Sequence, residues 1–310
     1  MSVLVQIARS VPKSVDAVGV PVATSGAVAR SLGLGRAALA AHGFEGKLGQ
    51  VLVVPQPSGP AYIAIGVGAP GSLTPSSLRT AAAALVRAAG KRAVIATSLA
   101  DLDDVASLQA GQVVVEGAML AAYRFAAIVK EPVTRSLTEL VLVVGDSRAK
   151  AVAAGAERGQ VIAEAATLAR DLANTPPSNL NARHIADMAV QISALTGLGV
   201  EVFNRDQLLA MGCGGVVGVN RGSVEPPRVV KLTYMPRNPS GHLAMVGKGI
   251  TFDSGGLSIK TTDGMGTMKM DMSGAAAVLS AMSALKALKC KSRVTAYLMC
   301  TDNMPSGSAV

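Results

Sequence analysis

Short runs of apolar, β-branched residues alternate with helical stretches from one end of this 310-residue chain to the other. The first strand-like runs are QVLVVP and AYIAIGV; a helical stretch follows, PSSLRTAAAALVRAAG, and then the runs RAVIATSL and LTELVLVVG. Each run has the length and composition of a buried strand. Strands that alternate with helices favour an α/β fold, and this feature constrains the chain more than any other.

The alternation is interrupted once, and the interruption divides the chain. Residues 1–147 are predicted to form an amino-terminal α/β domain, and residues 148–173 one long linking helix. Small and apolar residues recur at helical spacing along that helix: Val152, Ala156, Gly159, Ala163 and Ala166. Two consecutive prolines in the run NTPPSNLN then end it. A second domain is therefore expected over residues 174–310.

The second domain is predicted to continue the alternation. Its predicted elements are a helix, ARHIADMAVQISALTG, the strands VEVF and HLAMVGKGI, a second helix, DMSGAAAVLSAMSALKALK, and a strand, RVTAYLMC. Apolar residues line one face of the second helix at three- and four-residue intervals, as expected for a helix packed on a sheet.

The positive charge of the chain does not by itself indicate a nucleic-acid partner. The formal charge is +9, but lysines and arginines are scattered singly, without a run of five or six. Aromatic residues make up 3% of the chain and tryptophan is absent, so a base-stacking surface is not expected. DNA is therefore a less favoured partner, and the charge is interpreted as a solvated surface.

Cysteine usage and hydropathy predict a cytoplasmic protein. Cys213, Cys290 and Cys300 form no CxxC pair and are expected to be buried thiols in a reducing compartment. The first twenty residues contain no apolar stretch of signal-peptide length, and no segment has about 18 apolar residues without charge. No membrane association is predicted.

A glycine pattern of the dinucleotide-binding type, formed by Gly66, Gly68 and Gly71, is interpreted as a set of turn glycines. The next helix is predicted to start with Thr74 as its cap and Pro75 in its first turn. The glycines therefore do not lead directly into a helix amino terminus, where phosphates bind.

Three side chains between Val246 and Gly274 are predicted to converge. Lys248 ends a strand, Asp253 follows five residues later in a glycine-rich loop, and Asp271 stands at the head of the next helix. Open α/β sheets hold ligands at the carboxyl ends of their strands. Carboxylates bind divalent cations and can bridge two of them, whereas a lysine joins such a site only as the neutral amine.

Each of these residues has another interpretation when it is taken alone. Asp271 is then a helix cap, and Asp253 begins an Asx-turn. Lys248 and Lys260 are then surface charges. Their joint arrangement favours a metal site over these separate roles.

A family resemblance rests on VGKGITFDSGGLSIKTTDGMGTMKMDMSGAAAVL, Val246 to Leu279, which is similar to the first metal-binding motif of the leucyl or cytosol aminopeptidases, peptidase family M17. Further similar segments are LARDLANTPPSNLNA, GVVGVNRGSVEPPRVVKLTY and TDNMPSGSA. The resemblance implies an amino-terminal macro-like α/β domain and, over 174–310, the first part of a metallo-aminopeptidase domain with a mixed sheet flanked by helices.

The resemblance also implies a role for individual residues. Lys248 and Asp271 resemble ligands of the tighter-binding metal ion, and Asp253 resembles the carboxylate that bridges two ions. Lys260 resembles the catalytic lysine that stabilises the oxyanion. Met268 resembles a wall of the pocket for the first substrate side chain, although a methionine there also suits simple packing. Together these five residues are the implied substrate-binding set.

The activity implied is release of amino-terminal residues, leucine preferred, from peptide substrates. Two divalent ions per subunit, Mn²⁺ or Zn²⁺, would assist hydrolysis of the amide, with bicarbonate as a possible base. Members of the family are homohexamers, so the same assembly is expected of a full-length chain.

One part of the family pattern does not occur in residues 1–310. The second motif, NTDAEGRL, supplies two more metal-binding carboxylates and the arginine that positions bicarbonate, and it is absent from the sequence. The chain is therefore expected to be a carboxy-terminally truncated fragment with little or no activity alone. Two alternatives stay open: a catalytically dead binding or DNA-associating member of the family, and a different hydrolase whose macro-like domain binds a nucleotide or ADP-ribose.

Overall fold

The computed structural model describes residues 3–128 and 137–310, and contacts divide the chain into two compact units. The amino-terminal unit comprises Met1–Arg124 and Glu131–Glu164, and the carboxy-terminal unit comprises Phe125–Lys130 and Ala165–Val310. Residues 1–2 and 129–136 of the predicted amino-terminal domain lie outside the described residues.

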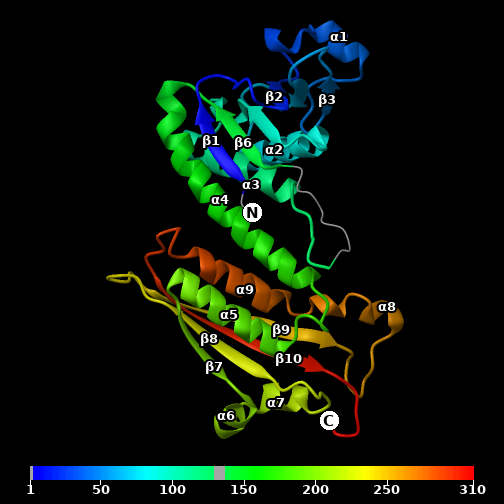
Figure 1. Cartoon of the computed structure of the whole chain (residues 1–310), viewed down its shortest axis with the longest axis vertical. Helices are drawn as coiled ribbons and strands as arrows, with labels where there is room; N and C mark the ends of the chain where they lie inside the picture. Colours follow the sequence, from blue (N-terminus) through cyan, green and yellow to red (C-terminus); the bar gives the residue numbers. More distant parts are fainter. Residues whose placement is uncertain (1–2, 129–136) are drawn as a thin grey trace. The chain divides into compact units, whose positions relative to one another are not determined.

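The amino-terminal unit is built on a six-stranded sheet with the order β1-β6-β5-β2-β4-β3 (Figure 1). All neighbouring strands are parallel except β3, which pairs antiparallel with β4 at one edge. The strands are β1 (Leu4–Ala8), β2 (Ala17–Val22), β3 (Val51–Val54), β4 (Ala61–Gly66), β5 (Val94–Thr97) and β6 (Glu139–Val143). The helical elements are η1 (Arg30–Leu32), α1 (Arg36–Ala41), α2 (Pro75–Ala89), η2 (Leu99–Asp101), α3 (Ser107–Ala121) and α4 (Asp146–Asn174).

Helices cover both faces of this sheet, which explains its unbroken apolar strands. Alternate residues of one strand enter different cores: Ile63 and Ile65 of β4 pack with α2 and α3, whereas Ala64 packs with Leu32 and Leu39 on the other side. Strands buried on both faces consist of continuous apolar runs. The α/β fold predicted from those runs is confirmed.

Helix α4 forms as one continuous helix of 29 residues, as its small-residue pattern predicts. Within the amino-terminal unit it packs against α3 at glycines. A Cβ atom on Gly155 would lie 1.8 Å from the Leu108 carbonyl oxygen, and one on Gly159 would lie 2.3 Å from that of Gln112. Only glycine allows two helix backbones to approach so closely. The helix start at Thr74 is also confirmed, since the Thr74 side chain accepts a hydrogen bond from the Ser77 amide.

The carboxy-terminal unit has a four-stranded mixed sheet with the order β7-β8-β10-β9, in which only β10 and β9 are parallel. Helices α5 and α9 lie on one face, and α6 and α7 lie on the other (Figure 1). The strands are β7 (Gly199–Phe203), β8 (Arg228–Tyr234), β9 (His242–Asp253) and β10 (Arg293–Asn303). The helical elements are α5 (Ala182–Thr196), α6 (Arg205–Ala210), α7 (Gly214–Asn220), α8 (Thr262–Met265), η3 (Met268–Met270) and α9 (Ser273–Ala284).

The structure corrects three sequence-based expectations in this unit. Strand β9 continues to Asp253, so Lys248 lies inside the strand and Asp253 is its last residue, not part of a loop. Asp271 does not cap α9, because the capping position is Met272 and no side chain caps it. Of the three cysteines only Cys300 is buried, and burial raises the pKa of its thiol to about 12. Cys213 and Cys290 are half-buried because they lie in turns beside helices.

Two sequence interpretations concerning glycine and hydropathy can be compared with the structure. Gly68 and Gly71 have φ angles of 85° and 74° and precede α2 by several residues, which confirms them as turn glycines, whereas Gly66 is the last residue of β4. Among the described residues, no helix combines the length and the apolar character needed to cross a membrane.

Candidate metal centre

The candidate site is built where the start of α9 crosses strand β9. A Cβ atom on Gly247 would lie 2.6 Å from the Cα atom of Ala275, and one on Gly274 would lie 3.0 Å from the Lys248 amide nitrogen. Helix and strand can approach this closely only because both positions are glycine. The close approach brings Lys248 next to the turn that precedes α9.

Lys248 forms an ion pair with Asp271 in that turn. The Lys248 Nζ to Asp271 Oδ2 distance is 2.9 Å, and the Asp271 side chain is 18% exposed. Asp271 Oδ2 is inaccessible to solvent and accepts no hydrogen bond from any described residue, so the contact has the distance of an ion pair without the alignment of a hydrogen bond. A buried carboxylate oxygen without a donor is costly unless a cation lies against it.

Asp253 is the better satisfied of the two carboxylates. Its Oδ1 atom accepts hydrogen bonds from the Gly255 amide at 3.0 Å and from Asn303 Nδ2 at 2.9 Å. Its Oδ2 atom lies 3.2 Å from Lys260 Nζ. Burial raises the pKa of Asp253, but the hydrogen bonds from Gly255, Lys260 and Asn303 outweigh burial and hold the pKa below its ordinary value. The carboxylate is therefore ionised at neutral pH.

A tight loop after β9 returns Lys260 to Asp253. The Lys260 amide donates to the Ser254 carbonyl oxygen at 2.8 Å. Gly255 and Gly256 adopt φ angles of 91° and 68°, and a Cβ atom on Gly255 would lie 2.3 Å from the Ser258 carbonyl oxygen. The glycine pair of the run DSGG is thus required by backbone conformation and by space.

The structure therefore joins four of the five predicted residues in two carboxylate–ammonium pairs. The fifth, Met268, is half-buried and opens η3, where its carbonyl oxygen accepts the Asp271 amide at 3.3 Å. This contact links Met268 to the site through the main chain. Sequence reasoning missed Asn303, whose donor reaches Asp253 from a strand 50 residues further along the chain.

The chemistry of the donors fits a divalent metal ion. Both carboxylates already lie against positive charge, and hard carboxylate oxygens suit Mg²⁺ and Mn²⁺ and also bind Zn²⁺. Within the part of the chain that the structure describes, no group of three or more His, Cys, Asp or Glu side chains could hold a metal. A site here therefore depends on the lysine nitrogen as well as on two carboxylates.

A hollow of about 350 Å³ lies beside the end of β9. Thr251, Asp302 and Met304 are among the residues that line it. Burial raises the pKa of Asp302, although a hydrogen bond from Ser223 opposes this. The hollow contains none of the four paired side chains, so the arrangement of charges, and not this cavity, defines the candidate site.

Two domain models of one protein family match this chain. The catalytic domain of the cytosol aminopeptidase family matches residues 167–310, and the N-terminal domain of the same family matches residues 21–132. The probable cytosol aminopeptidase of Leifsonia xyli subsp. xyli is 42% identical over 281 residues, covering 88% of this chain and 54% of the relative. That of Streptomyces avermitilis is 40% identical over 291 residues, covering 88% and 56%. The chain thus spans about half the length of these curated relatives.

Solved structures show the same fold. The structure titled "Bottromycin maturation enzyme BotP in complex with Mn" is 37% identical with a TM-score of 0.82, covering 96% of this chain and 61% of that one. A tomato leucine aminopeptidase mutant superposes with a TM-score of 0.85 at 22% identity and so supports the fold alone.

Proposed function

Because the chain belongs to the cytosol aminopeptidase family, we propose that it forms part of a metal-dependent enzyme that releases amino-terminal residues from peptides. The observation that carries the proposal is the paired arrangement of Lys248 with Asp271 and of Lys260 with Asp253. Peptide substrates, leucine preference, a homohexameric assembly and a cytoplasmic location are parts of the same proposal.

Lys248, Asp253 and Asp271 would hold the divalent metal ions. When bound, divalent ions such as Mn²⁺ or Zn²⁺ supply Lewis acidity toward the scissile carbonyl and lower the pKa of water. Lys248 joins the site only after its ammonium group loses a proton, and Asp271 Oδ2 has a free lone pair for a cation. Asp253 remains ionised because its hydrogen bonds depress its pKa.

Lys260 and Met268 would act on the substrate. Lys260 carries a positive charge beside Asp253, where it can offset the charge that develops on the carbonyl oxygen during hydrolysis. Met268 would line the pocket for the first side chain, because a flexible thioether adapts to an aliphatic group such as leucine. Residues 1–310 contain no arginine motif of the NTDAEGRL type, so bicarbonate is assigned to no residue here.

We expect the 310-residue chain to bind Mn²⁺ weakly and to turn over little substrate alone, because it presents two carboxylates and one lysine as ligands. Isothermal titration with Mn²⁺ tests the binding, using Asp271→Asn and Asp253→Asn as variants. Asp263→Asn is the matched control, since it removes the same charge from an exposed position of the same segment. Loss of binding in the first two variants but not in the control supports the site, and equal affinity in all three contradicts it.

Hydrolysis of leucine p-nitroanilide in excess Mn²⁺ tests the second part. The expected rate for the pure chain is indistinguishable from that of Asp271→Asn. A rate that is clearly higher and that disappears in Asp271→Asn would show that the ligands in this chain suffice for catalysis.

A further inference from the structure

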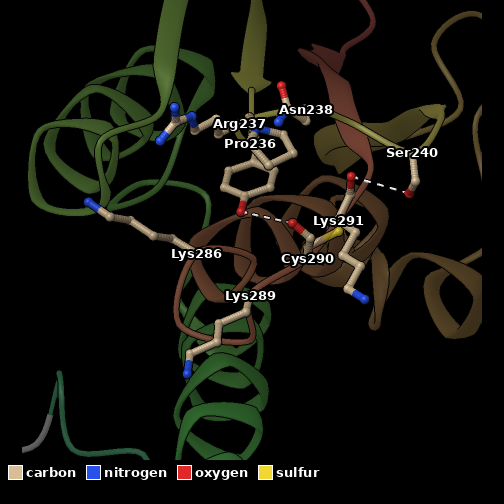
Figure 2. Close-up of a pocket in the computed structure, with 9 residues that line it drawn as sticks. Pro236, Arg237, Asn238, Ser240, Lys286, Lys289, Cys290 and Lys291 are labelled. Atoms are coloured by element: carbon tan, nitrogen blue, oxygen red, sulfur yellow. Dashed lines mark hydrogen bonds between the residues drawn. The ribbon is translucent and has the colours of Figure 1, made fainter.

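A cationic hollow lies on the carboxy-terminal unit, formed by the connection after β8 and the turn after α9 (Figure 2). Its volume is about 480 Å³. Arg237, Lys286, Lys289 and Lys291 line it, and no aspartate or glutamate does. None of these residues belongs to the candidate metal centre.

Two residues that line the hollow have an unusual backbone conformation. Asn238 and Lys289 have φ angles of 57° and 54°, and they are the only non-glycine residues with positive φ in the described parts of the chain. Lys289 occupies the left-handed position of a Schellman motif, in which the Cys290 amide donates to the Leu285 carbonyl oxygen at 2.9 Å. Glycine is the favoured residue at that position, so a lysine is kept there against a conformational cost.

A helix carboxyl terminus favours one nearby cation, but this explains neither four cations around one hollow nor the strained position of Lys289. In Figure 2 the charged ends of Arg237, Lys286, Lys289 and Lys291 point outward in different directions and do not converge on one point. Lysine and arginine side chains are long and rotatable, so these ends can turn toward several anionic groups of one ligand. A hydrogen bond joins two other lining residues, because the Tyr234 hydroxyl donates to the Cys290 carbonyl oxygen at 3.0 Å.

We infer that this hollow binds a small anion with several phosphate groups. Arginine pairs with phosphate oxygens through two parallel hydrogen bonds, and lysine neutralises phosphate as a point charge. The ligand class is a linear oligophosphate or a small molecule that carries one.

The test is titration of the 310-residue chain with inorganic triphosphate at constant ionic strength. Lys289→Gly should weaken binding at least fivefold and raise the unfolding midpoint, because glycine relieves the strained backbone. Lys91→Gly is the matched control, since Lys91 is exposed and follows the end of α2; its affinity for triphosphate should equal that of the wild-type chain. Equal affinity in Lys289→Gly and Lys91→Gly would overturn the inference. Binding of a single-stranded oligonucleotide without binding of triphosphate would overturn it as well.

A second inference comes from the strand register beside the candidate metal centre, and it rests on the proposed function. In the parallel pair β10–β9, Thr301 is opposite Ile250, but Asn303 is opposite Asp253. From Thr301 to Asn303 β10 moves forward by two residues, whereas from Ile250 to Asp253 β9 moves forward by three. Strand β9 therefore contains one extra residue, a β-bulge. In an uninterrupted strand, residues five apart point to opposite faces, and the extra residue returns Asp253 to the face of Lys248.

Asn303 holds the chain in this shifted register. Its carbonyl oxygen accepts the Ser254 amide at 3.0 Å and the Ser254 hydroxyl at 2.7 Å, while its side chain donates to Asp253 Oδ1. A Cβ atom on Gly256 would lie 2.8 Å from Asn303 Oδ1, so the loop closes directly over the amide. The donors of Gly255 and Asn303 occupy Asp253 Oδ1 and leave Oδ2 directed at cationic charge.

We propose that Asn303 is a positioning residue that orients Asp253 toward a metal ion. Outer hydrogen bonds of this kind fix ligand orientation, and their loss lowers metal affinity about 10- to 100-fold. The proposal assigns a role to Asn303 that needs no contact with metal or substrate.

Asn303→Ala tests the proposal, and Asn220→Ala is the matched control. Asn220 is a buried asparagine whose side chain donates to the Thr301 hydroxyl of β10 at 3.1 Å, but it does not reach Asp253. Both variants should lower the unfolding midpoint, whereas only Asn303→Ala should weaken Mn²⁺ binding, by about tenfold. Affinity of Asn303→Ala within twofold of that of Asn220→Ala would overturn the positioning role.

If the wild-type chain binds no Mn²⁺, the proposed function fails separately, and crystal structures of the metal-free wild type and of Asn303→Ala decide the positioning role. A rotated Asp253 carboxylate in the variant supports it, and an unchanged orientation overturns it.

Discussion

The two sheets of this protein use their strands differently. In the amino-terminal sheet, strands such as β4 and β6 place residues in cores on both faces, and Ile63 and Leu140 are fully buried. In the carboxy-terminal sheet, β8 and β10 do the same, but β9 contributes only Met245 to an apolar core, and that residue is partly buried. Along β9, glycines and charged side chains interrupt the apolar residues, and Leu243 and Val246 are exposed.

This difference shows how a strand whose side chains are not needed for the core can provide functional side chains. Gly247 lets α9 approach the backbone of β9, so the strand is held by main-chain contact and by pairing with β10. Side chains such as Lys248 are then free to form the site. Stability is expected to depend on the central strands, and metal binding on β9.

The largest expected effect is on stability, and it tests directly whether β4 and β9 contribute differently to the core. Ile63→Ala in β4 should lower the free energy of unfolding by about 3 kcal/mol, because a fully buried isoleucine leaves a cavity. Val246→Ala in β9, where the side chain is 66% exposed, should change it by less than about 0.5 kcal/mol. Urea unfolding measures both, and equal losses would show that β9 is as much a part of the core as β4.

The next effect concerns Asp271 and should separate binding from stability. Asp271→Asn should reduce Mn²⁺ affinity about 100-fold, equivalent to about 2.7 kcal/mol, by removal of a ligand charge. The unfolding midpoint should change little, because the ion-pair partner Lys248 is 57% exposed and water can solvate its ammonium group when Asp271 is replaced. A large loss of stability on titration with urea would identify Asp271 as a structural residue instead.

A smaller effect is expected at Gly256. Alanine there must adopt a φ angle of 68° and meets the Asn303 side chain, so Gly256→Ala should cost about 1 kcal/mol of stability. Mn²⁺ affinity should also fall severalfold as Asn303 shifts. Gly307→Ala provides the control, since a Cβ atom at Gly307 meets nothing within 4 Å. Equal affinities in the two variants would contradict this coupling.

The smallest effect is the acid dependence of Asp253. Because hydrogen bonds hold its folded pKa below the unfolded value, the ionised carboxylate stabilises the fold above about pH 4. That contribution should disappear as the pH falls through the lower, folded pKa. Unfolding free energies of the wild type and of Asp253→Asn should therefore differ at pH 6 and converge on acidification. A gap that widens at low pH would contradict the direction of the shift.

Much of the fold followed from the sequence because its signals are local. Apolar runs gave strands such as β4, β5 and β6, and the small-residue spacing gave α4, but β1, β2 and β8 were not predicted. Helix α3, Ser107–Ala121, was not predicted, because it packs on α4 through backbone contacts at glycines such as Gly155 and not through a distinct apolar stripe.

The site was only partly predictable for a related reason. One segment of 24 residues that resembles a family motif contains Lys248, Asp253, Lys260 and Asp271. A local pattern therefore predicts all four together. The bulge in β9 and the contact from Asn303 depend on register between two strands that are far apart in sequence. No local pattern records such a register, and this explains why Asn303 was missed.

The position of β9 in its sheet has one more consequence. The order β7-β8-β10-β9 leaves its outer edge without a partner among the described strands, and Leu243 and Val246 are 53% and 66% exposed. An unpaired edge with apolar side chains can accept a strand from another polypeptide. The strand that carries Lys248 and Asp253 is therefore also open to strand addition, so self-association of this chain through β9 would alter the site directly.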